Sequence, residues 1–476
     1  MRAGCAAVQL AAAVSIQRGT ETNMQIDAAS FQIQDYLNQT FSCSCGRTHR
    51  ADIEAVEIGR GALTLLPGYI KQHGYQKPFI VTDRNTFQAA GKTVLYELDR
   101  HEIPYLQYSY HEKHLSADEQ ATGRLIIEID PGCDVIIAVG AGTLNDICRM
   151  ASYKLKLPYY IVATAPSMDG FASNVAAMTV GGVKATYLAQ VPRLIVADTD
   201  VLSKAPMEMI AAGLGDMLGK YTCNTDWLLS HIITGEYYCP VIVEMVGKAV
   251  KKVTQNAGKI AARDPEVVGD IMEGLVLSGI AMSFVGNSRP ASGSEHHLSH
   301  YWEMKFQQEG REPIFHGTKV GIATVAVCRI YELLGGMGQP DFEAARRFGQ
   351  TFDETLWETR IANAFGSAAS EIMEYEKREG KNSKERHAKR IRVIEENWDR
   401  ILDVVQQKLP ASETIVTILN ELQAPFNPLQ AGIEAPLTYN ALLYGKEIRN
   451  RYTILQLVWD LGLLEAFAQE ITAYFS

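Results

Sequence analysis

Four of the eleven histidines fall in one short stretch, at positions 296, 297, 300 and 316. His296 and His300 are four residues apart and would share one face of a helix. Far upstream, Asp216 places a carboxylate at the start of a helical segment. Asp216, His296 and His316 would give one oxygen and two nitrogen ligands and leave positions open for a substrate. This set suits Zn²⁺ and can also take Fe²⁺ or Ni²⁺, although spacing alone leaves a metal-free histidine cluster as the alternative.

A turn of small residues follows an apolar run at 134–139. It consists of Gly140, Ala141, Gly142, Thr143 and Leu144. Small residues between a strand and a helix let the backbone approach a ligand, and the helix offers unpaired N–H groups, which together can bind a diphosphate. The segment is not the G-x-G-x-x-G motif, so a tight turn without a ligand remains the alternative.

A second polar segment follows the next apolar run. Thr164, Ser167 and Ser173 carry hydroxyls that could bind the ribose, phosphate or amide groups of a cofactor, and Asp169 could accept hydrogen bonds from substrate hydroxyls. Open α/β sheets bind ligands at this end of their strands. An ordinary Ser/Asp helix cap is the alternative.

The elements that must position these residues change character along the chain. Four strand-length apolar runs lie in the first part: Pro78–Asp83, Asp134–Val139, Pro158–Thr164 and Arg193–Asp198. Continuously apolar strands that alternate with helices, such as the expected helix at Asn145–Lys156, indicate a parallel sheet covered on both faces.

After Leu202 the periodicity is helical, and Pro265 sits at a position suited to the start of a helix. We therefore expect an α/β, Rossmann-like nucleotide-binding domain over residues 24–202 and an all-α domain over residues 203–476. The charged segment from Ser370 to Lys408 is expected to be a solvated helix face.

Composition restricts the functional classes. With 45 Lys and Arg against 55 Asp and Glu, the net charge of −10 disfavours binding to nucleic acid or to anionic membranes. Eight cysteines in 476 residues are too few for a disulfide scaffold, and no uninterrupted apolar run spans a bilayer, so we expect a cytoplasmic protein with reduced thiols. We interpret residues 1–23 as an upstream extension before Met24, with a weak signal sequence as the alternative.

The motifs in this order resemble those of the sn-glycerol-1-phosphate dehydrogenases, bacterial branch, within the superfamily of iron-type alcohol dehydrogenases, glycerol dehydrogenases and dehydroquinate synthases. The resemblance rests on FSCSCGRTH at 41–49, TAPSMDG at 164–170, GDMLGK at 215–220 and SRPASGSEH at 288–296. It runs from about Met24 to the C-terminus and implies a dehydroquinate synthase-like fold.

The resemblance also implies roles for residues at matching positions. Those that would contact NAD(P) are Gly140, Ala141, Gly142, Thr143, Leu144, Thr164, Ala165, Pro166, Ser167 and Ser173. Asp83 would bond the adenosine ribose and repel a 2′-phosphate, which favours NAD with NADP as the second option. Ala141 departs from the glycine or serine that the family often has, and alanine is tolerated there if φ stays negative.

For the reaction centre, the resemblance implies that Asp216, His296 and His316 bind one divalent metal, Zn²⁺ or Ni²⁺. Asp169, Asp216 and His300 would contact substrate, and either His300 or a water would supply a proton. The implied catalytic residues are therefore Asp216, His296, His316 and His300. His297 lies about 100° around the helix from His296 and is left out of this set.

The implied function is metal-dependent, NAD(P)H-dependent reduction of dihydroxyacetone phosphate, a sugar phosphate, to sn-glycerol 1-phosphate by a homodimer or larger oligomer. Its phosphate would need a cation, for which Lys220, Arg289 and Lys319 are candidates. Alternatives are a glycerol or iron-type alcohol dehydrogenase acting on an unphosphorylated polyol, a dehydroquinate synthase, which normally carries glutamate in place of Asp216, and a non-catalytic nicotinamide-binding sensor.

One motif stays outside this assignment. Cys43 and Cys45 with His49 could suggest a second metal site, but C-x-C is poor spacing for structural zinc and no second cysteine pair lies nearby. We expect a solvent-exposed feature without an assigned role.

Overall fold

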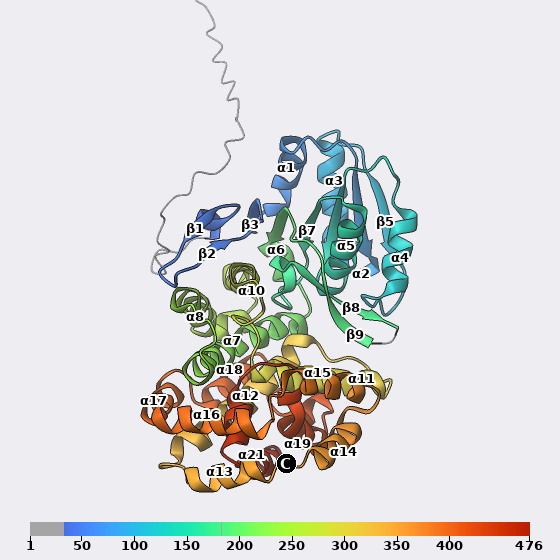
Figure 1. Ribbon diagram of the computed structural model, residues 1–476. Coiled ribbons are helices and arrows are strands. Elements are labelled where there is room, and N and C mark those ends of the chain that lie inside the picture. The colour runs from blue at the N-terminus through green and yellow to red at the C-terminus, as the bar shows by residue number, and fades with distance from the viewer. Residues whose placement is uncertain (1–32, 182) are drawn as a thin grey trace, which may run out of the picture.

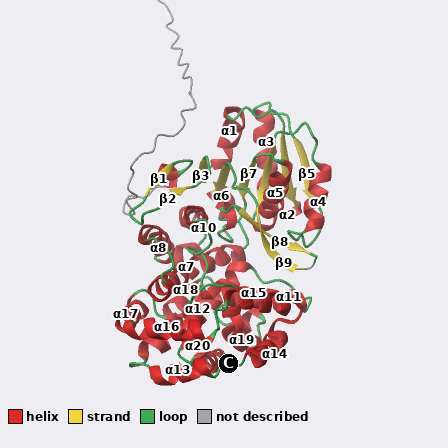
Figure 2. Cartoon of the chain, viewed as in Figure 1, coloured by secondary structure: helices red, strands yellow, loops and turns green. Residues whose placement is uncertain are grey.

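The computed structural model describes residues 33–181 and 183–476, and they form two lobes, one built around a sheet and one of helices (Figures 1 and 2). Residues 1–23 and Met24, interpreted above as an extension and a start, lie outside the described residues.

The central sheet has six parallel strands in the order β3-β10-β7-β6-β4-β5. The strands are β3 (Ala55–Gly59), β4 (Pro78–Asp83), β5 (Leu106–Tyr110), β6 (Val135–Gly140), β7 (Tyr159–Ala163) and β10 (Leu194–Asp198). The predicted fold class and the four predicted strands are confirmed. The two strands that were not predicted, β3 and β5, lie at the edges of the sheet, where partly exposed residues interrupt the apolar pattern.

Alternate residues of each strand pack on opposite faces, as the pleat requires. Val135, Ile137 and Val139 join one core with the helices α1 (Leu66–Gln72) and α3 (Lys92–Arg100). Ile136 and Ala138 point the other way, into a core shared with α4 (Glu119–Glu128) and α5 (Gly142–Leu155). Helices therefore cover both faces, as the continuously apolar strands predict.

Two antiparallel hairpins stand apart from the sheet. One is β1 (Thr40–Ser42) with β2 (Thr48–Arg50), and it lies beside helices of the lower lobe (Figure 1). The other is β8 (Val175–Val180) with β9 (Val183–Leu188). Two short helices follow strand ends directly: α2 (Arg84–Thr86) after β4 and α6 (Thr199–Leu202) after β10.

The second lobe is helical throughout, in agreement with the predicted fold class of an α/β part followed by a helical part. Its helices are α7 (Met207–Thr234), α8 (Pro240–Thr254), α9 (Ala257–Ala261), α10 (Pro265–Val285), α11 (Ser294–Gln308), α12 (His316–Gly336), α13 (Phe342–Gln350), α14 (Glu354–Phe365), α15 (Ala369–Glu379), α16 (Lys384–Glu396), α17 (Trp398–Gln407), α18 (Ser412–Glu421), α19 (Ala435–Tyr444), α20 (Ile454–Asp460) and α21 (Leu464–Phe475).

Two helical segments qualify the sequence interpretation. Among the described residues, α10 is long and apolar enough to cross a membrane, but 78% of its most apolar window is buried inside the protein, as in a core helix. The charged segment 370–408 forms three helices rather than one solvated face: Arg390 is buried and pairs with Asp460 through bonds of 2.7 and 2.6 Å.

Candidate functional site

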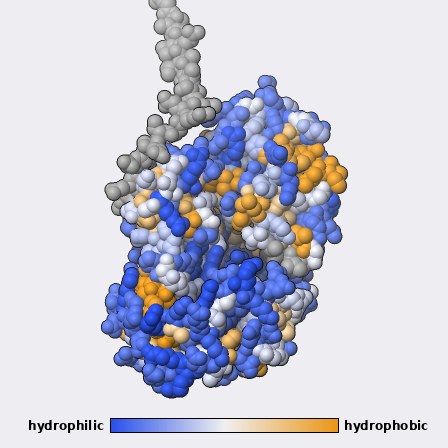
Figure 3. Space-filling model, viewed as in Figure 1, coloured by the Kyte–Doolittle hydropathy of each residue, from blue (hydrophilic) through white to orange (hydrophobic). Residues whose placement is uncertain are grey.

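A cleft of about 1750 Å³ lies at the carboxyl edge of the sheet and is lined by residues of both lobes. The space-filling view shows the surface hollowed between the lobes (Figure 3). The chain runs outward from β4 to β5 and then crosses back to β6 on the other side of β4, so strand order reverses between β4 and β6. Open α/β sheets bind ligands at such a point.

The small-residue turn occupies this point. Gly140 ends β6, and Ala141 precedes α5 with φ −110° and no side-chain cap, so the backbone N–H groups that begin the helix have no capping partner. The negative φ removes the objection to alanine. Ala141, Gly142, Thr143 and Leu144 line the cleft, whereas Gly140 is buried behind them.

Asp83 ends β4 on the neighbouring strand and also lines the cleft. Its Oδ1 accepts hydrogen bonds of 2.8 Å from the N–H groups of Asn85 and Thr86, which caps α2. Its Oδ2 has no hydrogen bond among the described residues. Asp83 therefore caps a helix and still keeps one carboxylate oxygen for a ligand hydroxyl.

The segment 164–173 runs along the cleft from the turn to the histidines. The Thr164 N–H donates to the Gly140 carbonyl at 3.1 Å, which joins it to the turn. Its members that line the cleft include Thr164, Ala165, Ser167, Asp169 and Ser173. Pro166 instead faces α7: a Cβ added to Gly213 would lie 1.7 Å from the Pro166 carbonyl oxygen, so only glycine permits this approach.

Close helix packing at a glycine also brings the Asp216 carboxylate to His316. A Cβ on Gly317 at the start of α12 would lie 1.8 Å from the Ala212 carbonyl oxygen of α7. Because these two helices approach at glycine, Asp216 on α7 comes next to His316, the first residue of α12. A side chain at either glycine contact would force the site apart.

Asp216, His296 and His316 converge from three helices. The Nε2 atoms of His296 and His316 are 3.3 Å apart, and His296 Nε2 lies 3.8 Å from Asp216 Oδ1. All three ligand atoms lie within 4.8 Å of one another. This donor set fits one divalent ion and leaves coordination positions toward the cleft, which His296 and His316 line.

A neighbouring carboxylate orients the His296 imidazole toward the possible metal position. His296 Nδ1 donates to Glu295 Oε1 at 2.7 Å, and Glu295 is held in turn by Thr222, whose hydroxyl donates to its other oxygen at 2.6 Å. The remaining His296 nitrogen, Nε2, faces the site, as in carboxylate–histidine–metal arrangements. Burial lowers the pKa of His296 and of His316, so both rings are neutral and present lone pairs.

Lys220 lies one helical turn after Asp216. Its ammonium donates to Asp169 Oδ2 at 2.7 Å and to Asp216 Oδ1 at 2.9 Å. Burial raises the pKa of Asp169, but Lys220 outweighs it and holds that pKa below its usual range; burial together with Asp169 raises the pKa of Asp216. Two carboxylates thus share one ammonium, and a cation would neutralise the remaining negative charge. Asp169 does not cap a helix with its side chain, so the cap interpretation of this segment is wrong there.

His300 completes the histidine group at the cleft wall. Its ring centroid lies 6.0 Å from that of His296 and 5.9 Å from that of His316, and its Nδ1 is 3.6 Å from Glu303. Burial lowers the pKa of His300 to about 4, with Glu303 opposing the shift. His297 does not line the cleft, and its two ring nitrogens are buried with no hydrogen-bond partner among the described residues.

The three cationic side chains considered for phosphate binding have different surroundings in the structure. Lys220 is committed to two carboxylates, and Arg289 is buried against Glu236 and the Tyr452 carbonyl, outside the cleft. Lys319 lines the cleft, 3.5 Å from Glu303.

Arg449 is a cleft-lining cation that the sequence analysis missed. Its Nε is buried and has no hydrogen-bond partner among the described residues. Burial has the largest effect on the pKa of His300, which it lowers, and the charge of Arg449 lowers that pKa further. Its position could not be inferred from the sequence, because the segment around it carries no recognised motif.

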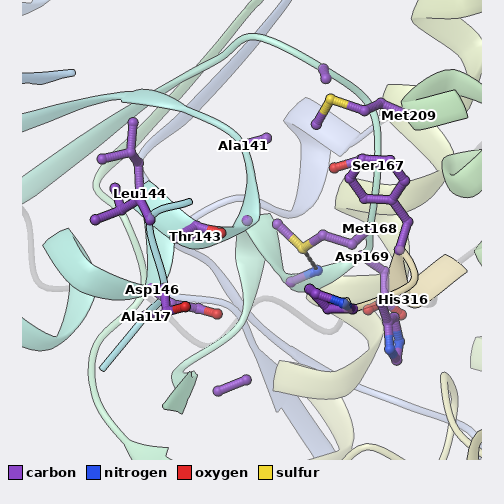
Figure 4. A pocket seen from close by; sticks show the side chains of 18 of the residues that line it. Ala117, Ala141, Thr143, Leu144, Asp146, Ser167, Met168, Asp169, Met209 and His316 are labelled. Atoms are coloured by element: carbon purple, nitrogen blue, oxygen red, sulfur yellow. Dashed lines mark hydrogen bonds between the residues drawn. The ribbon is translucent and has the colours of Figure 1, made fainter. Parts of the chain in front are cut away.

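Figure 4 shows the order of these groups along the pocket. Thr143 and Leu144 lie on one side, and Asp169 and His316 lie together on the other. Met168 sits between them, and its sulfur accepts from the Gly170 N–H at 2.9 Å. One cleft is therefore lined by an uncapped helix N-terminus, which could bind a diphosphate, and by two histidines of a group that could hold a metal ion.

The expectation for the C-x-C motif was wrong. His49 is only 1% exposed, and Cys43 and Cys45 are only partly exposed, because the hairpin folds against α10 and the start of α8. A buried cysteine from a distant part of the chain, Cys239, joins them.

Comparison with known proteins places the chain among dehydrogenases. Residues 57–206 match the iron-containing alcohol dehydrogenase family. The glycerol-1-phosphate dehydrogenase, NAD(P)+, of Geobacillus thermodenitrificans is 34% identical over 427 residues, which cover 88% of this chain and 96% of that protein. The protein of the same name from Halalkalibacterium halodurans is 41% identical over 294 residues, covering 61% and 74%.

Among solved structures, an alcohol dehydrogenase from Oenococcus oeni superposes with a TM-score of 0.59 at 14% identity, covering 90% of this chain and 98% of that one. That likeness shows a shared fold. Taken with the relatives that match over nearly their whole length, the chain belongs to the glycerol-1-phosphate dehydrogenase family.

Proposed function

We propose that this chain is a metal-dependent, NAD(P)-dependent glycerol-1-phosphate dehydrogenase that reduces dihydroxyacetone phosphate to sn-glycerol 1-phosphate, reversibly. The observation that carries the proposal is that one cleft is lined both by the turn residues 141–144 and by His296 and His316, whose ligand atoms meet that of the buried Asp216. A hydride donor and a Lewis acid must meet at one carbonyl, and this cleft holds a place for each.

Different residues would bind the nicotinamide cofactor and the metal ion. The N-terminus of α5 would bind the cofactor diphosphate, and Asp83 would bond the ribose and favour NAD over NADP. Asp216, His296 and His316 would hold Zn²⁺ or Ni²⁺, which polarises the ketone when bound and so favours hydride arrival at the carbonyl carbon. Asp169 stays beside this centre for contact with substrate hydroxyls.

We assign proton delivery to water, with His300 passing the proton from water to the substrate. The carbonyl oxygen gains one proton as the carbon gains hydride. Since burial keeps the pKa of His300 near 4, its ring is neutral at pH 7 and does not store the proton itself. A neutral imidazole can release the proton on one nitrogen to the carbonyl oxygen while its other nitrogen takes one up from water.

Arg449 supports a phosphorylated substrate. Its guanidinium has no hydrogen bond or ion pair with any other described residue, and it lines the same cleft as His300. The half-buried guanidinium has a buried Nε that a bound anion could satisfy, and a phosphate can accept two of its N–H groups. This contact would distinguish dihydroxyacetone phosphate from unphosphorylated ketones and polyols.

The proposal is tested by NADH oxidation with three substrates offered separately: dihydroxyacetone phosphate, dihydroxyacetone and, in reverse with NAD, glycerol. We expect kcat/KM to be highest for the phosphorylated ketone. Preference for dihydroxyacetone and glycerol would move the function to a polyol dehydrogenase while leaving the site residues in place. Cofactor binding without any turnover would indicate a sensor.

A variant sharpens the substrate assignment. Arg449→Met should raise KM for dihydroxyacetone phosphate about 30-fold, since a charge-assisted hydrogen bond contributes roughly 2 kcal/mol. Its kcat/KM for dihydroxyacetone should stay within about threefold. Arg311→Met is the matched control, because Arg311 also lines the cleft but is paired with Glu434. Equal losses on both substrates would contradict a phosphate contact.

We also propose a cellular location and an oligomeric state for the enzyme. A cytoplasmic homodimer or larger oligomer, free of nucleic acid and membrane, agrees with the net charge of −10 and with the unpaired cysteines of the described residues. Native mass measurement at working concentration tests the oligomeric state.

A further inference from the structure

A second group of side chains that could bind a metal lies outside the cleft lining. Cys43, Cys45 and His49 come from the β1–β2 hairpin, and Cys239 immediately precedes α8. None of the four lines the cleft. Their ligand atoms nevertheless lie within 4.8 Å of one another.

The distances are those of a tetrahedron around zinc. Cys43 Sγ lies 3.7 Å from Cys239 Sγ, and His49 Nε2 lies 3.4 Å from Cys45 Sγ and 3.8 Å from Cys239 Sγ. Zinc bonds of ~2.3 Å to sulfur and ~2.0 Å to nitrogen give tetrahedral edges of about 3.8 Å between sulfurs and about 3.5 Å between sulfur and nitrogen. A disulfide would need a sulfur separation of about 2.05 Å.

The histidine is oriented as a ligand. His49 is buried, and its Nδ1 donates to the Phe284 carbonyl at 2.8 Å. That bond fixes the tautomer and leaves the Nε2 lone pair directed at the sulfurs, the usual arrangement of a metal-bound histidine. Phe41 packs edge-on against Phe284 at 5.0 Å and closes this side of the cluster.

A hydroxyl donor lies beside one of the sulfurs, that of Cys45. A tight turn, in which the Gly46 N–H donates to the Cys43 carbonyl at 3.0 Å, brings Cys43 and Cys45 to the same side of the hairpin. The Tyr237 hydroxyl lies 3.0 Å from Cys45 Sγ, and the Arg47 guanidinium stacks 3.4 Å from the centre of the Tyr237 ring. A hydroxyl donor and a nearby cation both stabilise thiolates, the form that binds zinc.

We propose that Cys43, Cys45, His49 and Cys239 form a structural zinc site that fastens the N-terminal hairpin to the helical lobe. Four protein ligands, three of them sulfur, leave no open position, as in structural rather than catalytic zinc sites. Cys239 follows α7, which carries Asp216, and the intervening Glu236 pairs with Arg289 just before α11. The zinc would therefore hold the hairpin against elements that also support the cleft.

Metal analysis of the purified full chain tests this proposal directly. With zinc supplied during expression, we expect two ions per chain, one for each ligand group. Cys45→Ser should lose one ion and His296→Ala the other. Cys133→Ser is the matched control, a buried cysteine outside both groups that should keep both ions.

X-ray absorption at the zinc edge of His296→Ala provides a measurement that does not depend on Cys45→Ser folding. Its remaining zinc should show three sulfur neighbours and one nitrogen. A protein that binds zinc without any sulfur neighbour, or a Cys43–Cys239 disulfide found by mass spectrometry of the native chain, would overturn the site. Either result leaves the proposed dehydrogenase activity untouched.

Discussion

The cleft triad (Asp216, His296 and His316) and the cysteine cluster of the hairpin (Cys43, Cys45, His49 and Cys239) differ in ligand number, ligand type and access. The triad has three nitrogen and oxygen ligands, and two of its members line an open cleft. The cluster has four ligands, three of them sulfur, closed in by Tyr237 and Phe284. An open position lets a substrate reach the metal, whereas a filled shell only holds chain segments together. If both proposals hold, ligand count and exposure distinguish a reactive metal site from a structural one within this chain.

The largest effect is expected when one ligand of the triad is removed. His296→Ala should lower kcat/KM about 10³-fold, since a Lewis acid that stabilises the transition state by roughly 4 kcal/mol is lost. Steady-state NADH oxidation with dihydroxyacetone phosphate measures it. His111→Ala, an exposed histidine away from the cleft, is the control and should be unaffected. Full activity together with retained metal in His296→Ala would remove the triad from the mechanism.

Removing a ligand of the cysteine cluster should loosen the β1–β2 hairpin more than it lowers enzymatic turnover. Cys239→Ser should make trypsin cleavage after Arg47 or Arg50 at least about tenfold faster, because the hairpin opens more often once its anchor is lost. Peptide mapping over time measures this rate, again with Cys133→Ser as the control. Unchanged cleavage in Cys239→Ser would mean that packing of Phe41 on Phe284 alone holds the hairpin.

The smallest effect concerns the cofactor end of the cleft. Asp83→Asn keeps a good helix cap for α2 but removes the charge, so the preference for NADH over NADPH should fall about tenfold. The ratio of kcat/KM for the two cofactors reports it. Asp130→Asn, on the same lobe but outside the cleft, should leave the ratio unchanged. An unaltered ratio in Asp83→Asn would place cofactor selection elsewhere.

The sequence predicted what local pattern controls. Buried strands such as β6 and β7 are continuously apolar and were located within a residue or two. The residue types of Asp216, His296 and His316, together with the family resemblance, indicated a ligand set, and the structure brings these three side chains together. Edge strands were missed because β5, with its sequence LQYSY, has no continuous apolar run.

What the sequence did not reveal depends on distant contacts. Cys239 lies 196 residues from Cys43, and no pattern near either residue indicates that they meet. Arg449 reaches the cleft from a segment near the C-terminus that carries no motif. Helix packing through Gly213 and Gly317 decides which side chains converge, and this packing depends on the whole lobe.

The most direct test of the central claim is the rate of NADH oxidation with dihydroxyacetone phosphate before chelation, after chelation and after metal is added back. We expect the rate to fall at least about 10²-fold with chelator and to return with Zn²⁺ or Ni²⁺, while the more enclosed cysteine-bound zinc is retained. An undiminished rate in protein shown to have lost the metal of the triad would contradict metal-dependent catalysis at Asp216, His296 and His316.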